Sequence, residues 1–432
     1  METVPRRSRF YGWDNAIILF VIYMIAMGIV FYGFSVIFPT MVNNMGWKRG
    51  EASLAHTIRG YLVGFLTPLV ALCINRFGSK KTMTCGLGVM FVGLILLGTS
   101  ISKLWHWLLI WGVIMPFGFA FGGMLPIQSV ITHWFNIRRA TVLGLVTTSA
   151  PLGGFLAQPF FTWLMKEYNM WQIGWLTCGG FAILSLILSL WIRNKPEEFD
   201  QYPDGLSSSE AKAAAAGYGK VARTFRTREV WTLRETIKCR SLWLVMLVNL
   251  TQITALYIIV VHGVLHLTDL GYTNMRAASV ISFIILGSGL ARFPVGWLGD
   301  IIEPRWICSI AMALMMFSFF GIWKAPNMTL LLITGPVFGF CYGTIIVLIP
   351  AIIGNYWGPA SFANTTAFIT PFMVALGAPV PVIAGYIADY FGSYDLAFLS
   401  IGILIAIGAV LAVFMKPPQK GQSEKHAEKI TT

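Results

Sequence analysis

The chain has 432 residues, of which 56% are hydrophobic and 11% are charged, and its formal net charge is +13. A soluble globular domain has about 25% charged residues, so this chain has too few charges to cover the surface of a folded soluble protein. The composition excludes a soluble enzyme, a nucleic-acid-binding protein and a disordered protein, and it predicts a chain whose outer surface faces lipid.

Twelve apolar segments follow one another along the chain, each with the length of a membrane span, which needs roughly 20 residues. They lie at 16–40, 52–74, 83–101, 105–132, 140–164, 171–193, 242–266, 278–299, 306–323, 328–353, 364–388 and 395–415. The pattern predicts an all-α membrane protein with twelve transmembrane helices in two six-helix halves, residues 1–193 and 241–416. A polar linker at 194–240, with a short helix expected around Ala213 to Ala216, separates the halves, and a tail follows at 417–432.

The basic residues predict the orientation, because cytosolic loops carry an excess of Lys and Arg. With the N-terminus inside, the outer loops hold six of the 31 basic residues, 23 lie on the cytosolic side, and two lie within spans. The six are Lys48, Arg49, Lys103, Lys166, Arg276 and Lys324. We therefore expect a multi-pass protein of the cytoplasmic membrane with both termini in the cytosol, whose partner is the lipid bilayer and not nucleic acid.

The two halves are weakly similar to each other. A shift of 223 residues places Trp134 on Trp357 and Gly154 on Gly377. Repeated halves are typical of secondary transporters, whose substrate site lies between the repeats near the middle of the membrane.

Several motifs resemble those of the major facilitator superfamily, and of its branch of monocarboxylate transporters and oxalate/formate antiporters. The most specific is WFNIRRATVLGLVTTSAPLGGF at Trp134 to Phe155, which is similar to the branch's signature between the fourth and fifth helices. FYGWD at Phe10 to Asp14 resembles the start of bacterial members. The resemblance implies the major facilitator fold, with a conformational motif made by Asn75, Arg76, Gly78, Lys80, Arg138, Arg139, Gly296 and Asp300.

Three positions depart from the family pattern. Asn75 stands where the superfamily motif usually has aspartate, Thr40 where animal monocarboxylate carriers have a lysine, and Ser288 where they have an aspartate. In those carriers the lysine and aspartate are linked to proton coupling, so that mechanism does not transfer directly. The helix-11 lysine of the oxalate antiporters also has no counterpart here.

Arg292 is the main candidate for substrate binding. It lies in the middle of the eighth span, about 12 Å from Asp300 at 1.5 Å per residue, where a charged side chain costs at least about 2.5–3.5 kcal/mol. A structural ion pair would offset this cost, but no Asp or Glu lies inside a span. A guanidinium group matches a carboxylate bidentately, so Arg292 is expected to bind a substrate carboxylate.

Four further polar residues are candidates for the same site. Tyr342 and Tyr32 could each offer a hydroxyl to a bound carboxylate, although packing explains them as well. Asn249 and Gln252 share one face of the seventh span and either bond neighbouring helices or line the cavity.

Arg59, His56 and His262 are candidates for coupling or gating. Arg59 either extends to the outer water surface, makes a second anion contact or acts in an outer gate. His56, one turn away, could carry a proton. His262 and His266 are four residues apart without a third metal ligand, which favours a role at the interface or in a gate over a metal site.

No catalytic triad, phosphate-binding glycine loop or paired carboxylate lies within a span, so the chain is expected to be neither an enzyme nor dependent on a cofactor or metal. The sequence predicts alternating-access transport of a small organic anion, such as lactate, acetate or formate, with protons as a candidate co-substrate. The alternatives are anion exchange of the oxalate/formate type and a transporter-like anion sensor that signals through the linker. No obligate protein partner is evident.

Overall fold

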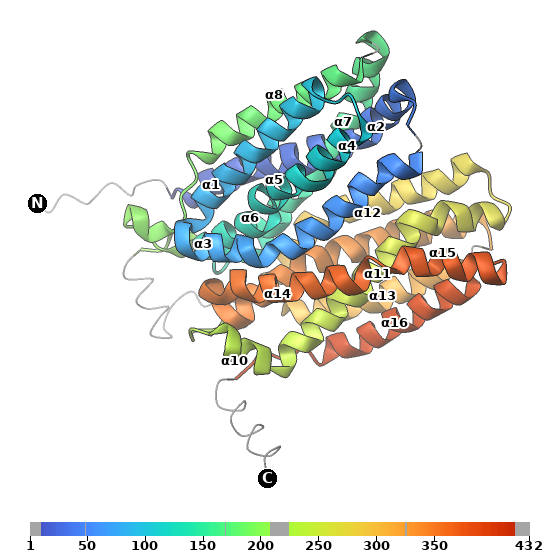
Figure 1. Ribbon diagram of the computed structural model, residues 1–432. Helices are drawn as coiled ribbons and strands as arrows, with labels where there is room; N and C mark the ends of the chain where they lie inside the picture. The colour runs from blue at the N-terminus through green and yellow to red at the C-terminus, as the bar shows by residue number, and fades with distance from the viewer. Residues whose placement is uncertain (1–9, 48, 169, 208–223, 325, 420–432) are drawn as a thin grey trace, which may run out of the picture.

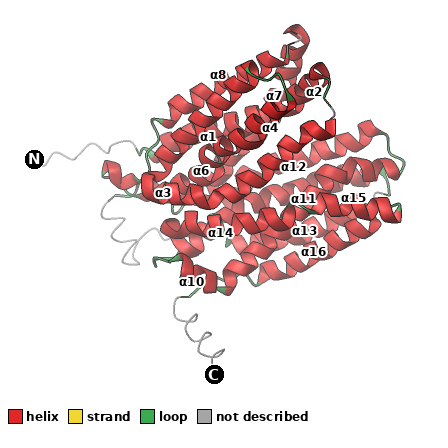
Figure 2. Ribbon diagram, in the orientation of Figure 1, coloured by secondary structure: helices red, strands yellow, loops and turns green. Residues whose placement is uncertain are grey.

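The computed structural model describes residues 10–47, 49–168, 170–207, 224–324 and 326–419, which form helices and connecting loops (Figure 2). The helix expected around Ala213 to Ala216 lies outside the described residues. Figure 1 shows the elements of the N-terminal half, coloured blue to green, beside those of the C-terminal half, coloured yellow to red.

The N-terminal half begins with a span that is continuous over α1, a π-helical segment and α2. Its elements are α1 (Gly12–Tyr23), the π-helical segment (Met24–Phe31), α2 (Tyr32–Met45), α3 (Arg49–Thr99), α4 (Leu104–Leu109), a second π-helical segment (Ile110–Ile114), α5 (Met115–Gly122), α6 (Met124–Trp134), α7 (Arg139–Tyr168) and α8 (Trp171–Ser189).

The linker holds two short 3₁₀ turns, Pro196–Phe199 and Pro203–Gly205, and the helix α10 (Leu233–Lys238). The C-terminal half then consists of α11 (Arg240–Asp269), α12 (Asn274–Gly299), α13 (Pro304–Lys324), α14 (Met328–Gly377), α15 (Val380–Phe391) and α16 (Asp395–Val413).

The twelve expected spans appear as ten continuous helical stretches in the described residues, because two stretches each contain two spans. Leu54–Thr99 has 46 residues and Met328–Ala388 has 61, each more than twice the roughly 20 residues that one crossing needs. Within α3 and α14 the chain turns at Gly78 (φ 85°) and Gly358 (φ 77°). Glycine adopts this left-handed conformation without the steric cost that a side chain would impose, so each pair of spans is joined by a tight turn. The twelve-helix arrangement is thus confirmed.

One end of the bundle carries the linker, and we call it the linker end. There α1 starts and α8 ends, since the Asn15 side-chain amide donates to the Arg193 carbonyl (3.1 Å). α11 starts and α16 ends there too, since the Ser241 hydroxyl donates to the Lys416 carbonyl (2.6 Å). α10 lies at this end as well (Figure 1).

The buried apolar core of each half includes side chains from the other half. The core of the C-terminal half extends to Val70 and Ile74 of α3. A core of the N-terminal half extends to Val347 and Ala351 of α14. The halves are therefore packed together and share buried surface.

Candidate substrate site and the contact between the halves

The contact between α7 and α12 starts at Asp300, directly after the end of α12. Its carboxylate accepts hydrogen bonds from the backbone N–H groups of Ala140 (3.0 Å) and Thr141 (2.7 Å) and from the Thr141 hydroxyl (2.7 Å). A carboxylate is stabilised at this position because the first N–H groups of a helix lack partners within the helix and carry a partial positive charge. The expected motif residue Asp300 thus joins the two halves.

The equivalent contact between α3 and α14 carries no charge. The Asn75 side-chain amide donates to the Asn364 side-chain oxygen over 2.6 Å. The shift of 223 residues places Thr141 on Asn364 and places Asn75 two residues before Asp300, so the two contacts lie at similar positions of the internal repeat. Asn75, which replaces the family aspartate, keeps the contact through a neutral amide pair.

The backbones of α7 and α12 also come into close contact at two glycines. A Cβ atom added at Gly144 would collide with the Arg292 carbonyl oxygen, and one added at Gly296 would collide with the Ala140 carbonyl oxygen. A side chain at either position would force the helices apart. Gly296 therefore serves close packing between the halves.

Arg139 and Arg138, adjacent at the start of α7, have different surroundings. Arg139 is fully buried, and its Nη1 donates to the Asn355 side-chain oxygen of α14 over 2.9 Å. Its Nε also donates to the Phe135 carbonyl (3.3 Å). The Arg138 side chain is exposed, while its backbone N–H donates to Asp204 of the linker (3.1 Å). Only the second arginine of the pair connects the halves.

The remaining motif residues lie at the turn within α3. Arg76 is exposed, with its guanidinium 5.3 Å from the centroid of the Phe77 ring. The Lys80 backbone N–H donates to the Asn194 side-chain oxygen (2.7 Å), and a Cβ atom on Gly78 would lie 2.9 Å from the Asn194 side chain. Lys80 and Gly78 thus join the turn to the start of the linker.

Arg292 lies buried between the halves, about 12 Å from Asp300 along α12, and is 7% exposed. Its Nη1 donates to the Thr147 carbonyl of α7 over 2.7 Å, and its Nη2 donates to the Ser288 hydroxyl over 3.4 Å. Nε has no hydrogen-bond partner, and no acidic side chain pairs with Arg292 among the described residues. A guanidinium has five N–H donors, so some of the donors of Arg292 remain available for a ligand.

Tyrosine side chains from both halves lie around Arg292. Tyr342 of α14 and Tyr23 of α1 are close enough to interact electrostatically with it. Tyr342 has the same relation to Tyr32 of α2 and to Tyr257 of α11. Sequence reasoning identified Tyr342 and Tyr32 but missed Tyr23 and Tyr257, which the same signal, a phenol inside an apolar span, could have indicated.

The two amides of α11 are not joined to Arg292 by any hydrogen bond in the described part of the chain. Gln252 is fully buried, and neither its Nε2 nor its Oε1 has a partner. Asn249 is half-buried. Gln252 can therefore still donate and accept hydrogen bonds. A buried amide without partners costs free energy, which a ligand bound beside it would offset.

The Arg59 side chain is buried among side chains of the protein. Its side chain is 9% exposed, and its Cζ lies 5.0 Å from the centroid of the Phe31 ring and 5.3 Å from that of Phe119. Its Nη2 lies 3.4 Å from Nε2 of His56. Arg59 is thus a second buried cation within the membrane.

His262 and His266 make separate local contacts. Nε2 of His262 lies 2.7 Å from the Pro381 carbonyl and Nδ1 lies 3.1 Å from the Tyr394 hydroxyl, while Nε2 of His266 lies 2.8 Å from the Trp323 carbonyl. Across the described residues, no group of three or more metal-binding side chains is found. The two histidines join α11 to other helices at the end opposite the linker.

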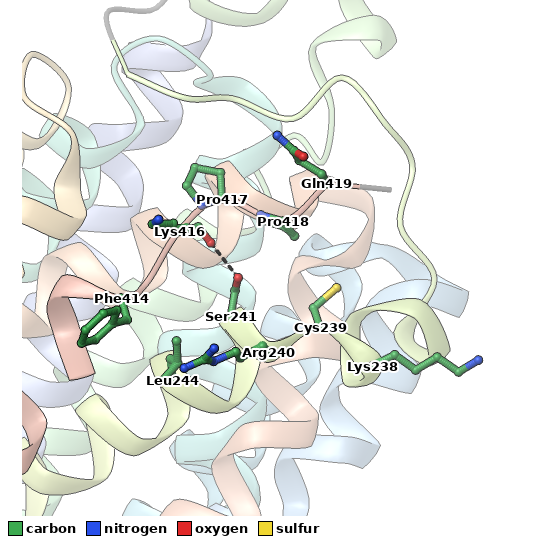
Figure 3. A pocket seen from close by; sticks show the side chains of 10 residues that line it. All are labelled: Lys238, Cys239, Arg240, Ser241, Leu244, Phe414, Lys416, Pro417, Pro418 and Gln419. Carbon is green, nitrogen blue, oxygen red and sulfur yellow. Dashed lines mark hydrogen bonds between the residues drawn. The ribbon is translucent and has the colours of Figure 1, made fainter. Parts of the chain in front are cut away.

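A pocket of about 360 Å³ lies at the linker end, where α10 and α11 meet the segment after α16 (Figure 3). It is lined by Lys238, Cys239, Arg240, Ser241, Leu244, Phe414, Lys416, Pro417, Pro418 and Gln419. In Figure 3 the Lys238 side chain points away from the other labelled residues. The pocket contains none of the predicted substrate residues, so it is separate from the region around Arg292.

A helical membrane bundle of two related six-helix halves, with polar groups between them, is the architecture of secondary transporters. The family model of the Major Facilitator Superfamily matches residues 17–288 and 242–432. The chain belongs to this superfamily and is a multi-pass membrane transporter.

Relatives of known name cover most of the chain at low identity. Monocarboxylate transporter 12 of Rattus norvegicus is 23% identical over 410 residues, which are 88% of this chain and 81% of that protein. Monocarboxylate transporter 13 of the same species is 23% identical over 414 residues, 92% of this chain and 88% of that protein.

Solved structures share the fold. The transporter FucP in the outward conformation aligns with a TM-score of 0.72 at 15% identity, covering 95% of this chain and 100% of that one. The human organic anion transporter MFSD10 aligns with a TM-score of 0.68 at 12% identity, covering 94% and 100%. At these identities the likeness concerns the fold alone.

Proposed function

We propose that the protein transports a small organic anion, a monocarboxylate such as lactate, acetate or formate, across the cytoplasmic membrane by alternating access. The observation that carries this proposal is the Arg292 guanidinium, which is buried between the halves with an unpartnered Nε and no acidic partner among the described residues. A buried cation costs several kcal/mol unless an anion offsets the cost. The substrate carboxylate is the anion that we assign to it.

The binding chemistry follows from the donors around Arg292. A guanidinium binds a carboxylate through two parallel N–H···O bonds, and Tyr342 adds a hydroxyl donor. Tyr32, Asn249 and Gln252 complete the proposed site, with Gln252 contributing an amide that has no partner within the protein. The names of the curated relatives, which are monocarboxylate transporters, support the same substrate class. We assign no catalytic reaction to the protein.

Alternating access requires the halves to separate at one end while they close at the other. In this proposal the hydrogen bonds of Asp300 and Asn75 between the halves keep the linker end closed. With the linker and both termini in the cytosol, as the distribution of basic residues suggests, this end is the cytosolic gate. Arg139 and Gly296 contribute to the same closure, while Arg76, Gly78, Lys80 and Arg138 position the loops that carry it.

Coupling is proposed in two forms. In the first, carboxylate and proton move together and His56 carries the proton, because it is the titratable group beside Arg59. In the second, one anion exchanges for another, which two buried arginines without an intramembrane acid favour. Ser288 is uncharged and cannot form an ion pair with Arg292. The chain therefore lacks the aspartate that the animal carriers have at this position. His262 is proposed to stabilise the closed arrangement of α11 against α15 and α16.

Uptake of labelled lactate, acetate, formate and oxalate into proteoliposomes tests the proposal, with and without an inward proton gradient. Matched vesicles carry Arg292→Ala or the exposed outer control Arg276→Ala. Uptake that the gradient stimulates and Arg292→Ala abolishes supports symport. Uptake that ignores the gradient and requires internal anion supports exchange. Normal uptake by Arg292→Ala, or no movement of any of the four anions, would refute the carboxylate assignment.

A further inference from the structure

Arg59 is a buried intramembrane arginine, and the proposed substrate site assigns no ligand to it. Asn75 and Asp300 occupy related positions at the linker end, and Arg59 lies 16 residues from Asn75 along α3, whereas Arg292 lies 8 residues from Asp300 along α12. At 1.5 Å per residue the two arginines differ in depth by about 12 Å. Arg59 therefore lies nearer the end opposite the linker.

The surroundings of Arg59 are apolar and contain unused hydrogen-bond donors. The ring centroids of Phe31 and Phe119 lie 5.0 and 5.3 Å from its Cζ, so two apolar rings pack against the guanidinium. Its Nε and the Nδ1 of His56 are both buried without a partner. Because Nε2 of His56 faces an Arg59 N–H over 3.4 Å, it acts as an acceptor, and the neutral ring then carries its proton on Nδ1. Two unpaired donors thus lie one turn apart on α3.

Among the described residues no carboxylate forms an ion pair with Arg59. The ion pairs of the described residues involve Arg226 with Asp300 and Lys324 with Asp395, both away from α3. Contact with aromatic rings recovers only part of the free energy that burying an ion costs. In a site of low dielectric constant, an anion from outside would interact strongly with this cation.

We propose that Arg59 and His56 form a second carboxylate-binding site, which the transported anion occupies on its way between the end opposite the linker and Arg292. This proposal rests on the proposed function. Tyr257 of α11, in the other half, interacts electrostatically with Arg59 and with Tyr342, which has the same relation to Arg292. In this proposal the Tyr257 hydroxyl lies between the two sites. The anion would pass from one guanidinium to the next along these phenols.

Equilibrium binding of labelled lactate and labelled oxalate to the purified full-length protein tests the second site. The wild-type protein is expected to bind two carboxylates per chain, Arg59→Gln and Arg292→Gln one each, and the double variant none. Arg276→Gln, which removes an exposed arginine of α12, is the matched control and should still bind two. Arg59→Lys keeps the charge without the planar fork, and at least a tenfold weaker second affinity is expected for it.

The failure of this inference is distinguishable from the failure of the proposed function. One carboxylate per wild-type chain, lost in Arg292→Gln and kept in Arg59→Gln, overturns the second site and leaves the first. Two carboxylates that both persist in Arg59→Gln also overturn it. No binding of either anion by the wild-type protein overturns both proposals.

Transport kinetics give an independent readout. For uptake from the side opposite the linker, Arg59→Gln should raise KM at least about tenfold, since a hydrogen bond to a charged group contributes about 1.5–3 kcal/mol, and should change kcat much less. If Arg59→Gln does not fold, Tyr257→Phe, which keeps the ring and removes the hydroxyl between the sites, should slow transfer and lower kcat. An unchanged KM in Arg59→Gln, or an unchanged kcat in Tyr257→Phe, contradicts the proposal.

Discussion

The Arg226 guanidinium of the linker lies 3.1 Å from the Asp300 carboxylate, the same carboxylate that accepts the hydrogen bonds of the α7 N-terminus. Arg226 also donates through Nε to the Asn136 carbonyl before α7 (2.8 Å). Both charged side chains are less than a tenth exposed. The linker is therefore part of the contact between the halves and not only a covalent connection.

Burial raises the pKa of the Asp300 carboxyl, against the opposing effect of the Thr141 and Ala140 donors and of Arg226. Burial likewise lowers the pKa of the Arg226 guanidinium, against the effect of Asp300. Both shifts express the cost of desolvating the pair. A buried pair of this kind contributes little net free energy, but removal of one partner leaves the other charge uncompensated.

Arg226→Ala should therefore open the linker end. Spin labels at Lys81 of α3 and Trp306 of α13, in a cysteine-free background, should show a larger share of long distances than in the unsubstituted linker. Arg228→Ala, in the same segment but exposed, is the control and should leave the distance distribution unchanged. Identical distributions in the two variants would show that Arg226 does not hold the halves together.

Arg139 and Arg138 give a matched pair for stability. Arg139→Gln should lower the free energy of unfolding by roughly 2–4 kcal/mol, because it leaves Asn355 and the carbonyl of Phe135 without their charged donor. Arg138→Gln should change it by less than about 0.5 kcal/mol, since its side chain is exposed. Thermal unfolding in detergent measures the stability of both variants. Equal losses of stability would contradict a stabilising contact of Arg139 between α7 and α14.

Gly144→Ala should impair transport although it adds a single methyl group. The new Cβ would collide with the Arg292 carbonyl oxygen, so α7 and α12 would separate and the hydrogen bond from Arg292 to Thr147 would be lost. Gly180→Ala, where a Cβ meets nothing within 4 Å, is the control. Uptake into proteoliposomes should fall at least about tenfold in the first variant only, and normal uptake in it would exclude a tight α7–α12 contact during the cycle.

Ser288→Asp should give Arg292 an intramolecular anion, because Ser288 lies 3.4 Å from its Nη2. The introduced carboxylate competes with the substrate, so KM should rise at least about tenfold at neutral pH. Protonation removes this competition, so the affinity should recover as the pH falls through the pKa of the introduced carboxyl. KM measured against pH checks the prediction. A KM equal to that of the unsubstituted protein at every pH would argue that the carboxylate does not bind at Arg292.

The spans, the two halves and the membrane-buried Arg292 were all predictable from the sequence. Each rests on local information, because a crossing needs roughly 20 apolar residues in a row and a charge within such a run is visible without a structure. The turns at Gly78 and Gly358 were not predicted, since a glycine within a polar or aromatic stretch does not reveal whether a loop or a tight turn follows.

Only the tertiary structure decided which polar groups meet. Arg226 and Asp300 are 74 residues apart, Arg139 and Asn355 216, and Asn75 and Asn364 289. The burial of Arg59 also depended on the helices around it, because the same side chain on an isolated span would reach the water surface. Hydrophobic patterning fixes which segments enter the membrane, but contacts between segments depend on packing and on charge pairing that no single segment contains.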